Sequence, residues 1–144
     1  MKKTLSTLAL SLFAFAGIAQ AADITVENAA GKQVVPQNPQ RVVVLDFRAL
    51  GVQDKIVGFP QSGKIPNYLS EFADKKYKNV GDLKEQSLEQ INELNPDLII
   101  ASKRQEKMID KFKEIAPVFN VENDYTNYYP SFQQNVTALG QIFS

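Results

Sequence analysis

Short runs of β-branched and aliphatic residues alternate with segments of helical periodicity from residue 41 to the end of the chain. Each run is apolar throughout and bounded by polar or turn-forming residues, as in strands that are buried on both faces of a sheet. Strand–helix repetition of this kind predicts an α/β fold with a doubly wound, mostly parallel sheet and helices on both faces. The predicted strands are residues 41–45, 56–59, 97–101 and 118–121.

Two serine–glutamine pairs have the spacing of a capping box, in which the serine oxygen accepts a first-turn amide and the glutamine reaches back. Ser87 with Gln90 predicts a helix that ends before Pro96, and Ser131 with Gln134 predicts a helix that continues to the last residue. Further helices are expected at residues 68–72 and 108–115. The apolar face of the last helix is predicted to consist of Phe132, Val136, Leu139 and Phe143.

The first 21 residues have the pattern of a cleavable signal peptide. Lys2 and Lys3 precede a mostly apolar stretch at residues 5–18, which is shorter than the ~20 residues that span a bilayer. Cleavage is predicted after Ala21, so that a soluble protein is released into the periplasm without stable membrane insertion. Residues 22–40 then predict a small hairpin, with 30–32 between its strands, and a linker before a domain at 41–144.

Composition excludes several classes of function. The chain contains no cysteine and no histidine, so it has no disulfide, no cysteine–metal site and neither of the commonest zinc ligands. Lys+Arg and Asp+Glu are both 16, so no basic excess indicates nucleic-acid binding. Glycine-rich phosphate-binding motifs are absent from the sequence. Asp46 ends a predicted strand, but without a nearby histidine or cysteine it does not indicate catalysis.

Ligands of open α/β sheets bind outside the carboxyl ends of the strands. Here those ends lead into residues 46–48, 102–105 and 124–129. Lys103 and Arg104 stand together at the start of a helix, a position that is unfavourable for cations, and this indicates an anionic partner. The alternative is that both are solvated surface charges. The tyrosines at 125, 128 and 129 are either pocket walls or part of an ordinary surface loop.

Several segments carry a resemblance to a known family. They are residues 41–47, 79–81, 87–91, 94–100 and 102–105, in this order. The sequence resembles the class III periplasmic binding proteins for ferric siderophores, haem and vitamin B12, and is most similar to the catecholate-siderophore branch. The resemblance implies two α/β lobes with the ligand between them. This chain matches the N-terminal lobe and stops inside an amphipathic helix, so we expect a truncated lobe.

The resemblance also implies roles for individual residues. Arg104 matches an arginine that contacts the anionic iron–catecholate group, whereas Lys103 stands where relatives often have glycine. Lys64 lies near the position of a pocket lysine in some relatives. Glu89 matches a glutamate that pairs with arginines of the membrane permease; without the resemblance it reads as a solvated helix residue. The segment after Phe47 is shorter than in relatives, which shortens the first helix.

The function implied by the resemblance is non-enzymatic. The protein is expected to be a monomer that binds a ferric siderophore and delivers it to an inner-membrane ABC permease. Because the siderophore holds the iron, we expect no cofactor and no metal ligand from the protein. Haem or cobalamin binding is the alternative within the class, and a non-functional truncated lobe is another. A secreted α/β hydrolase is the alternative from a different class, and it requires a nucleophile–base pair.

Overall fold

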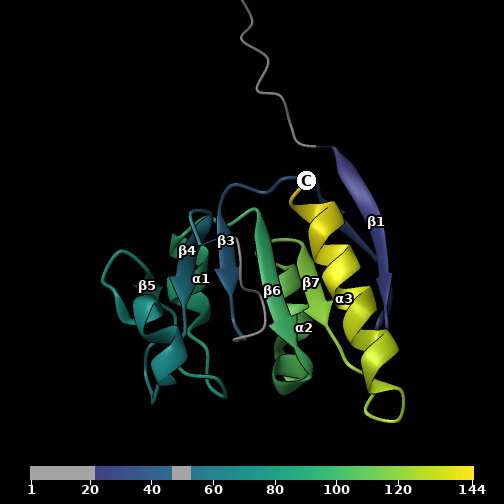
Figure 1. The fold of residues 1–144 in the computed structure, drawn as a ribbon. Coiled ribbons are helices and arrows are strands. Elements are labelled where there is room, and N and C mark those ends of the chain that lie inside the picture. Colours follow the sequence, from purple (N-terminus) through teal and green to yellow (C-terminus); the bar gives the residue numbers. More distant parts are fainter. Residues whose placement is uncertain (1–21, 47–52) are drawn as a thin grey trace, which may run out of the picture.

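The computed structural model describes residues 22–46 and 53–144, and its main element is a parallel five-stranded sheet (Figure 1). All of its strand pairs are parallel, which confirms the predicted fold class. The predicted signal peptide and the shortened segment after Asp46 lie outside the described residues. The strands are β3 (Val42–Val44), β4 (Ile56–Phe59), β5 (Lys78–Asn79), β6 (Leu98–Ser102) and β7 (Val118–Val121).

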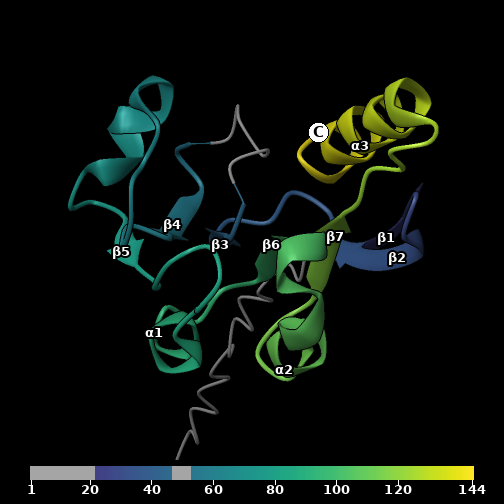
Figure 2. The same cartoon turned by 90° about the horizontal axis from the view of Figure 1, so that it is seen from below.

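The strand order is β5-β4-β3-β6-β7, so the winding direction reverses between β3 and β6. The chain adds β4 and β5 on one side of β3 and then crosses back to add β6 and β7 on the other side. Val42, Val43 and Val44 pair with Leu98, Ile99 and Ile100 across this switch point. The carboxyl ends of the strands lie together along one edge, which is the lower edge in Figure 1 and faces the viewer in Figure 2.

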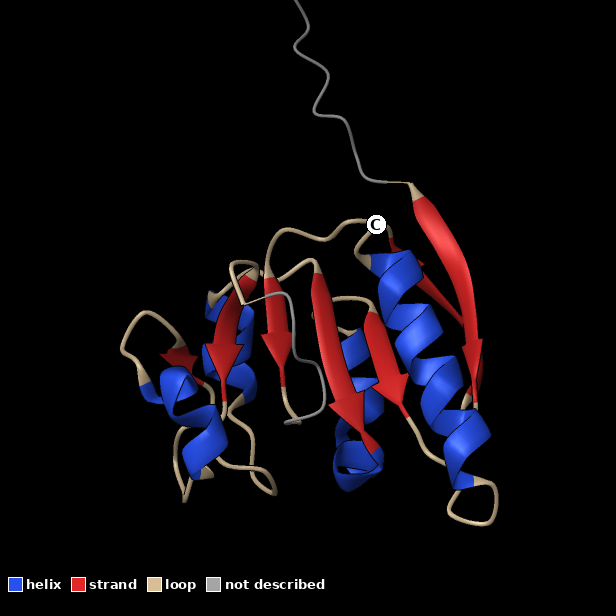
Figure 3. Ribbon diagram, viewed as in Figure 1, coloured by secondary structure: helices blue, strands red, loops and turns tan. Residues whose placement is uncertain are grey.

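Helices cover both faces of the sheet, as predicted (Figures 2 and 3). One face carries α1 (Leu88–Glu93) and α2 (Ile109–Lys113), the latter preceded by the 3-10 segment η2 (Lys103–Met108). The other face carries the 3-10 segment η1 (Asn67–Ala73) and α3 (Tyr128–Ile142). In the described residues, no helix combines the length and apolar character needed to cross a membrane.

The β-branched runs alternate their side chains between two hydrophobic clusters. Val42 and Val44 pack with the residues of η1 and α3, and Val43 packs with the residues of α1 and α2. All three valines are at most 1% exposed. Because both faces of the strand are covered, an unbroken apolar run is stable there, and each buried valine contributes on the order of 1.5–3 kcal/mol.

The N-terminal hairpin is confirmed as β1 (Asp23–Asn28) and β2 (Gly31–Pro36), paired antiparallel. Its turn consists of Ala29 and Ala30, one residue earlier than expected, because Gly31 is already paired in β2. The hairpin is attached to the edge strand β7 through side chains. Gln33 accepts the amide of Asn120 at 2.7 Å, and the carbonyl of Asn120 accepts from Asn28 at 2.8 Å.

Helix α1 begins directly after Ser87, whose side chain accepts the amide of Gln90 at 3.2 Å. The second half of the predicted capping box is replaced by a sheet-like bond, because the amide of Ser87 donates to the carbonyl of Val80 at 2.9 Å. The helical segments expected at residues 68–72 and 108–115 are present as η1 and as the end of η2 with α2.

The prediction for the last helix is wrong in three respects. The helix ends at Ile142 rather than at the last residue. Helix α3 begins at Tyr128 rather than at Ser131, and Ser131 is a buried residue whose hydroxyl donates to the carbonyl of Tyr128 at 2.8 Å. The side that faces the protein is also different, because Phe132 is 46% and Val136 is 53% exposed. The buried positions of the helix are Ser131, Asn135, Ala138 and Ile142, with Leu139 and Phe143 partly buried beside them.

A buried asparagine explains this orientation of α3. The amide of Asn135 donates to the carbonyl of Glu122 at 2.8 Å and to the side chain of Asn123 at 2.9 Å. Its oxygen accepts from Asn28 of the hairpin at 2.7 Å. Because these partners satisfy the polar atoms, the asparagine face can be buried in place of the aromatic one.

Candidate functional site

The candidate site lies where β3 and β6 end, at the switch point of the sheet. The hydroxyl of Ser102 donates to the carboxylate of Asp46 at 2.5 Å, and both residues are 5% exposed. The crevice at a switch point is where open α/β sheets bind ligands. The two strand ends are therefore joined by a buried, charge-assisted hydrogen bond at the expected position of a ligand.

A capping box that was not predicted from the sequence shapes the loop after β6. The side chain of Ser102 accepts the amide of Arg104 at 3.3 Å, and Gln105 accepts the amide of Ser102 at 3.0 Å. Gln105 is only 2% exposed and donates to the carbonyl of Leu83 at 2.8 Å. The Ser-x-x-Gln spacing at 102–105 is the same pattern that was recognised at 87–90, so the sequence contained this information.

Arg104 lies beside Asp46 at the carboxyl edge of the sheet. Its Nε is 3.8 Å from the carboxylate of Asp46, and its side chain is 58% exposed whereas that of Asp46 is 6% exposed. An ion pair with so exposed a partner is screened by water and contributes little to stability. The exposed guanidinium lies close to Asp46 beside the switch point, with donors available to an anion that approaches from solvent.

Lys103 points toward the end of β7 rather than toward Asp46. Its ammonium is 3.8 Å from Glu122, with side-chain exposures of 65% and 28%. The two adjacent cations therefore diverge. Lys103 lines a polar cavity of about 540 Å³ between the hairpin, the end of β7 and the start of α3. Its other lining residues include Asn28, Asn123, Tyr125 and Gln134.

Lys64 lies on the opposite side of the switch point, in the loop after β4. It is exposed and lines a cavity of about 250 Å³ together with Asp82 and Lys84. Asp82 accepts the backbone amides of Glu85 at 2.8 Å and Lys84 at 2.6 Å. These hydrogen bonds hold the pKa of the Asp82 carboxyl below its ordinary value, and the bond from Glu85 has the largest effect. Lys84 was not a candidate from the sequence, because only the fold brings the loops after β4 and β5 together.

The tyrosines form a ladder on the surface. The ring of Tyr125 stacks on that of Tyr128 at 6.3 Å, and Tyr128 stacks on Phe132 at 6.3 Å. Tyr125 is 72% exposed and lines the same cavity as Lys103, whereas Tyr129 is exposed on α3 and does not line it. Of the three tyrosines, Tyr125 is therefore the one at the carboxyl edge beside a candidate cation.

Glu89 is exposed in the first turn of α1. It lines neither of the two cavities described above. Residues 22–46 and 53–144 also contain no group of three or more acidic side chains that could hold a metal ion.

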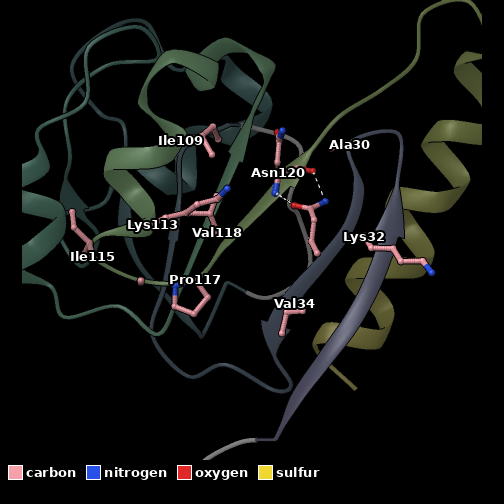
Figure 4. A pocket seen from close by; sticks show the side chains of 11 residues that line it. Ala30, Lys32, Val34, Ile109, Lys113, Ile115, Pro117, Val118 and Asn120 are labelled. Carbon is pink, nitrogen blue, oxygen red and sulfur yellow. Dashed lines mark hydrogen bonds between the residues drawn. The ribbon is translucent and has the colours of Figure 1, made fainter.

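A further cavity of about 680 Å³ lies away from the switch point, between β2, α2 and β7 (Figure 4). Its lining is largely aliphatic and includes Val34, Ile109, Ile115 and Val118. It is larger than the two cavities at the carboxyl edge. However, it borders Pro117 and Val118, which lie at the amino end of β7 rather than at its carboxyl end. We therefore place the candidate site at the carboxyl edge, where the carboxyl ends of the strands lie together.

Comparison with known proteins identifies a family. A family model described as periplasmic binding protein matches residues 41–144. The petrobactin-binding protein YclQ of Bacillus subtilis is 41% identical over an alignment that covers 83% of this chain and 40% of YclQ. The Fe(3+) dicitrate-binding periplasmic protein FecB of Escherichia coli is 34% identical over an alignment that covers 94% of this chain and 48% of FecB.

Solved structures show the same likeness. The crystal structure of YclQ superposes with a TM-score of 0.80 at 39% identity, covering 85% of this chain and 45% of that one. The catecholate-siderophore binding protein VctP of Vibrio cholerae superposes with a TM-score of 0.76 at 33% identity, covering 85% of this chain and 46% of VctP. The chain thus spans less than half the length of these relatives. By its sequence and its fold, it belongs to the periplasmic binding protein family.

Proposed function

We propose that this chain is a solute-binding component of an ABC importer, which captures a ferric siderophore of the catecholate type and delivers it to an inner-membrane permease. Relatives named for petrobactin and ferric anguibactin support a siderophore as the ligand, and VctP, which is named for catecholate siderophores, supports the catecholate type. The observation that carries the proposal is the exposed guanidinium of Arg104, which lies 3.8 Å from Asp46 beside the switch point. An arginine at this position suits an anionic ligand.

The chemistry of the ligand fits the residues at the site. A ferric tris-catecholate is strongly anionic, and its oxygens accept hydrogen bonds from an arginine fork without displacement from the iron. The siderophore supplies all the metal ligands. The protein therefore needs charge and hydrogen-bond donors rather than histidine or cysteine, neither of which occurs in the chain. The same cations favour an anionic ligand over cobalamin.

Binding rather than catalysis is the proposed role. The structure brings a serine and an aspartate together, but the Ser102 hydroxyl donates directly to Asp46, and the chain has no histidine to stand between them. Acyl-transfer triads depend on such a base. The hydrogen bond between Ser102 and Asp46 is therefore assigned to the shape of the site.

The test is a titration of the purified chain with ferric tris-catecholate siderophore, followed by tyrosine fluorescence quenching. Arg104→Ala should weaken binding roughly tenfold, since a hydrogen bond to a charged group is worth about 1.5–3 kcal/mol and this site is partly screened. Lys111→Ala on α2 removes a cation away from the site and should leave the affinity unchanged. Equal affinities of the parent and Arg104→Ala would remove this loop from the ligand site. Binding of haem or cobalamin in place of the siderophore would change the ligand class.

Docking and export are part of the proposal. The exposed position of Glu89 on α1 suits a contact with permease arginines. Glu89→Arg, in a chain completed with a second lobe, should abolish uptake but preserve ligand binding. Uptake at the parental rate would exclude a docking role. Export to the periplasm predicts a mature N-terminus at Ala22, which intact-mass measurement of periplasmic material would detect.

A further inference from the structure

Strand β7 is the last strand of the five-stranded sheet, so one of its edges has no neighbouring strand in that sheet. On this edge the side-chain amide of Gln33 takes the place of a peptide group. Its oxygen accepts the amide of Asn120 at 2.7 Å, and its nitrogen donates to the carbonyl of Asn120 at 3.2 Å. The edge of β7 therefore already pairs with an amide that comes from a side chain rather than from a strand.

Two residues earlier on the same edge, the backbone of Val118 is unpaired. The amide of Ile99 donates to the carbonyl of Pro117 at 2.9 Å, and alternation along the strand then turns the N–H and C=O of Val118 away from β6. Within residues 22–46 and 53–144, these two groups have no hydrogen-bond partner. An unpaired strand edge is a template for the addition of another strand.

The edge of β2 that faces away from β1 is unpaired as well. The amide of Gln37 donates to the carbonyl of Ala22 at 2.9 Å, and this pair sets the alternation along the hairpin. By that alternation, the N–H and C=O of Val34 point away from β1, and the described part of the chain offers them no partner. Val34 and Val118 both line the cavity of about 680 Å³ between β2, α2 and β7 (Figure 4).

The side chains of this cavity indicate what a bound segment should carry. Ile109, Ile115 and Val34, which is 63% exposed, favour aliphatic contacts. Lys113 is directed from α2 toward β7 in Figure 4, no acidic side chain lines the cavity, and the described residues give Lys113 no ion-pair partner, which favours a carboxylate. Asn120 also lines the cavity, and its Oδ1 is a buried acceptor without a partner among the described residues. A fatty-acid carboxylate supplies no donor for it, whereas a peptide does.

We propose that the cavity between β2 and β7 binds an extended peptide segment of another protein, which adds as a strand to the edge of β7 at Val118. The segment alternates aliphatic with polar residues and carries an acidic residue for Lys113. Main-chain hydrogen bonds supply the affinity, and the aliphatic and acidic contacts supply the specificity. The cavity borders the amino end of β7, away from the carboxyl edge at which the siderophore is proposed to bind, so this inference stands independently of the proposed function.

The test is amide NMR of the ¹⁵N-labelled purified chain with the capped hexapeptide Val-Thr-Val-Glu-Val-Thr. We expect the amide signals of Val118 and Val34 to shift. At a peptide concentration ten times the dissociation constant, their exchange with solvent should slow roughly tenfold. The same peptide, N-methylated at every residue, keeps its side chains but has no backbone donors, and it should leave both amides unchanged. Unchanged Val118 and Val34 amides at millimolar unmodified peptide would overturn the inference.

Matched variants test the contacts. Val34→Asp should weaken binding roughly tenfold, because it removes an aliphatic contact and repels the glutamate of the peptide. Val136→Asp changes a valine of similar exposure on α3 and should keep the parental affinity. Lys113→Gln should weaken binding by roughly two- to fivefold, and a peptide with glutamine in place of glutamate should remove this difference. Lys111→Gln, on the same helix but outside the cavity, should bind as the parent does.

Four further results would contradict the proposal. Equal binding of the N-methylated peptide would mean apolar adsorption rather than strand pairing. Amide shifts with decanoate but not with the peptide would assign the cavity to an alkyl carboxylate. Self-association of the peptide-free chain that Val34→Asp abolishes would assign it to a second copy. Peptide binding that is lost in a chain completed with a second lobe would mean that the rest of the protein fills the cavity.

Discussion

The hydroxyl of Ser102, the last residue of β6, donates to the buried carboxylate of Asp46 at 2.5 Å across the switch point of the sheet. The same hydroxyl accepts the amide of Arg104 and so begins η2. Ser102→Ala should therefore lower the free energy of unfolding by about 2–3 kcal/mol, because a charge-assisted hydrogen bond and a helix cap are lost together. Urea denaturation measures this change.

Two variants make this prediction specific. Ser102→Thr keeps the hydroxyl and should recover most of the stability, whereas Ser70→Ala removes an exposed hydroxyl of η1 and should change stability by less than ~0.5 kcal/mol. If Ser102→Ala unfolds at the same urea concentration as the parent, the hydrogen bond to Asp46 does not stabilise the strand ends.

Two glycines should respond in opposite ways to alanine. Gly81 has φ +108° and a Cβ there would collide with the carbonyl oxygen of Glu85, so Gly81→Ala should destabilise the protein by about 1–3 kcal/mol. Gly140 lies inside α3 with nothing within 4 Å of a Cβ, so Gly140→Ala should stabilise by about 0.5–1 kcal/mol. Thermal unfolding of both variants measures whether each melts above or below the parent. A higher melting temperature for Gly81→Ala would contradict the positive φ and the close contact at Gly81.

Helix α3 offers a test of which of its faces is buried. Asn135→Ala should cost about 2–3 kcal/mol, because it leaves the side chains of Asn28 and Asn123 without their buried partner. Phe132→Ala should cost less than ~1 kcal/mol, since the ring is 46% exposed. Chemical denaturation of both variants shows which of the two loses more stability. A loss of about 3–5 kcal/mol for Phe132→Ala would instead indicate an aromatic ring in the core.

The Asp82 loop should be sensitive to acid. The amides of Glu85 and Lys84 lower the pKa of the Asp82 carboxyl below its ordinary value of 3.8. The charged form is favoured in the folded loop, so its contribution to stability is complete above pH 3.8 and is lost as the pH falls through the lower, folded-state pKa. An NMR titration should give a pKa below 3.8, with the Lys84 and Glu85 amide shifts following it. These shifts should be absent in Asp82→Asn, and a pKa at or above 3.8 would contradict the loop hydrogen bonds.

The sequence by itself determined four of the five strands of the sheet and its two layers of helices, whereas the two-residue strand β5 was not predicted. A run such as Val42 to Val44 is apolar on both sides of the strand, so it is buried only when helices cover both faces of the sheet. The alternation of strands and helices along the chain then favours a parallel sheet. The same pattern predicted where the strands end, and therefore that Arg104 lies at the carboxyl edge of the sheet. These features were predictable because they depend on periodicity within short segments.

Only the tertiary structure decided which polar groups meet. It buried Asn135 rather than Phe132, because Asn28 and Asn123 arrive from distant segments to satisfy the amide. It also separated Lys103 from Arg104, since Glu122 and Asp46 lie at the ends of different strands, and it brought Lys84 to the cavity of Lys64. Burial of a polar group is stable only when its partner is in place, and the position of a partner far along the chain is a property of the fold rather than of any local pattern.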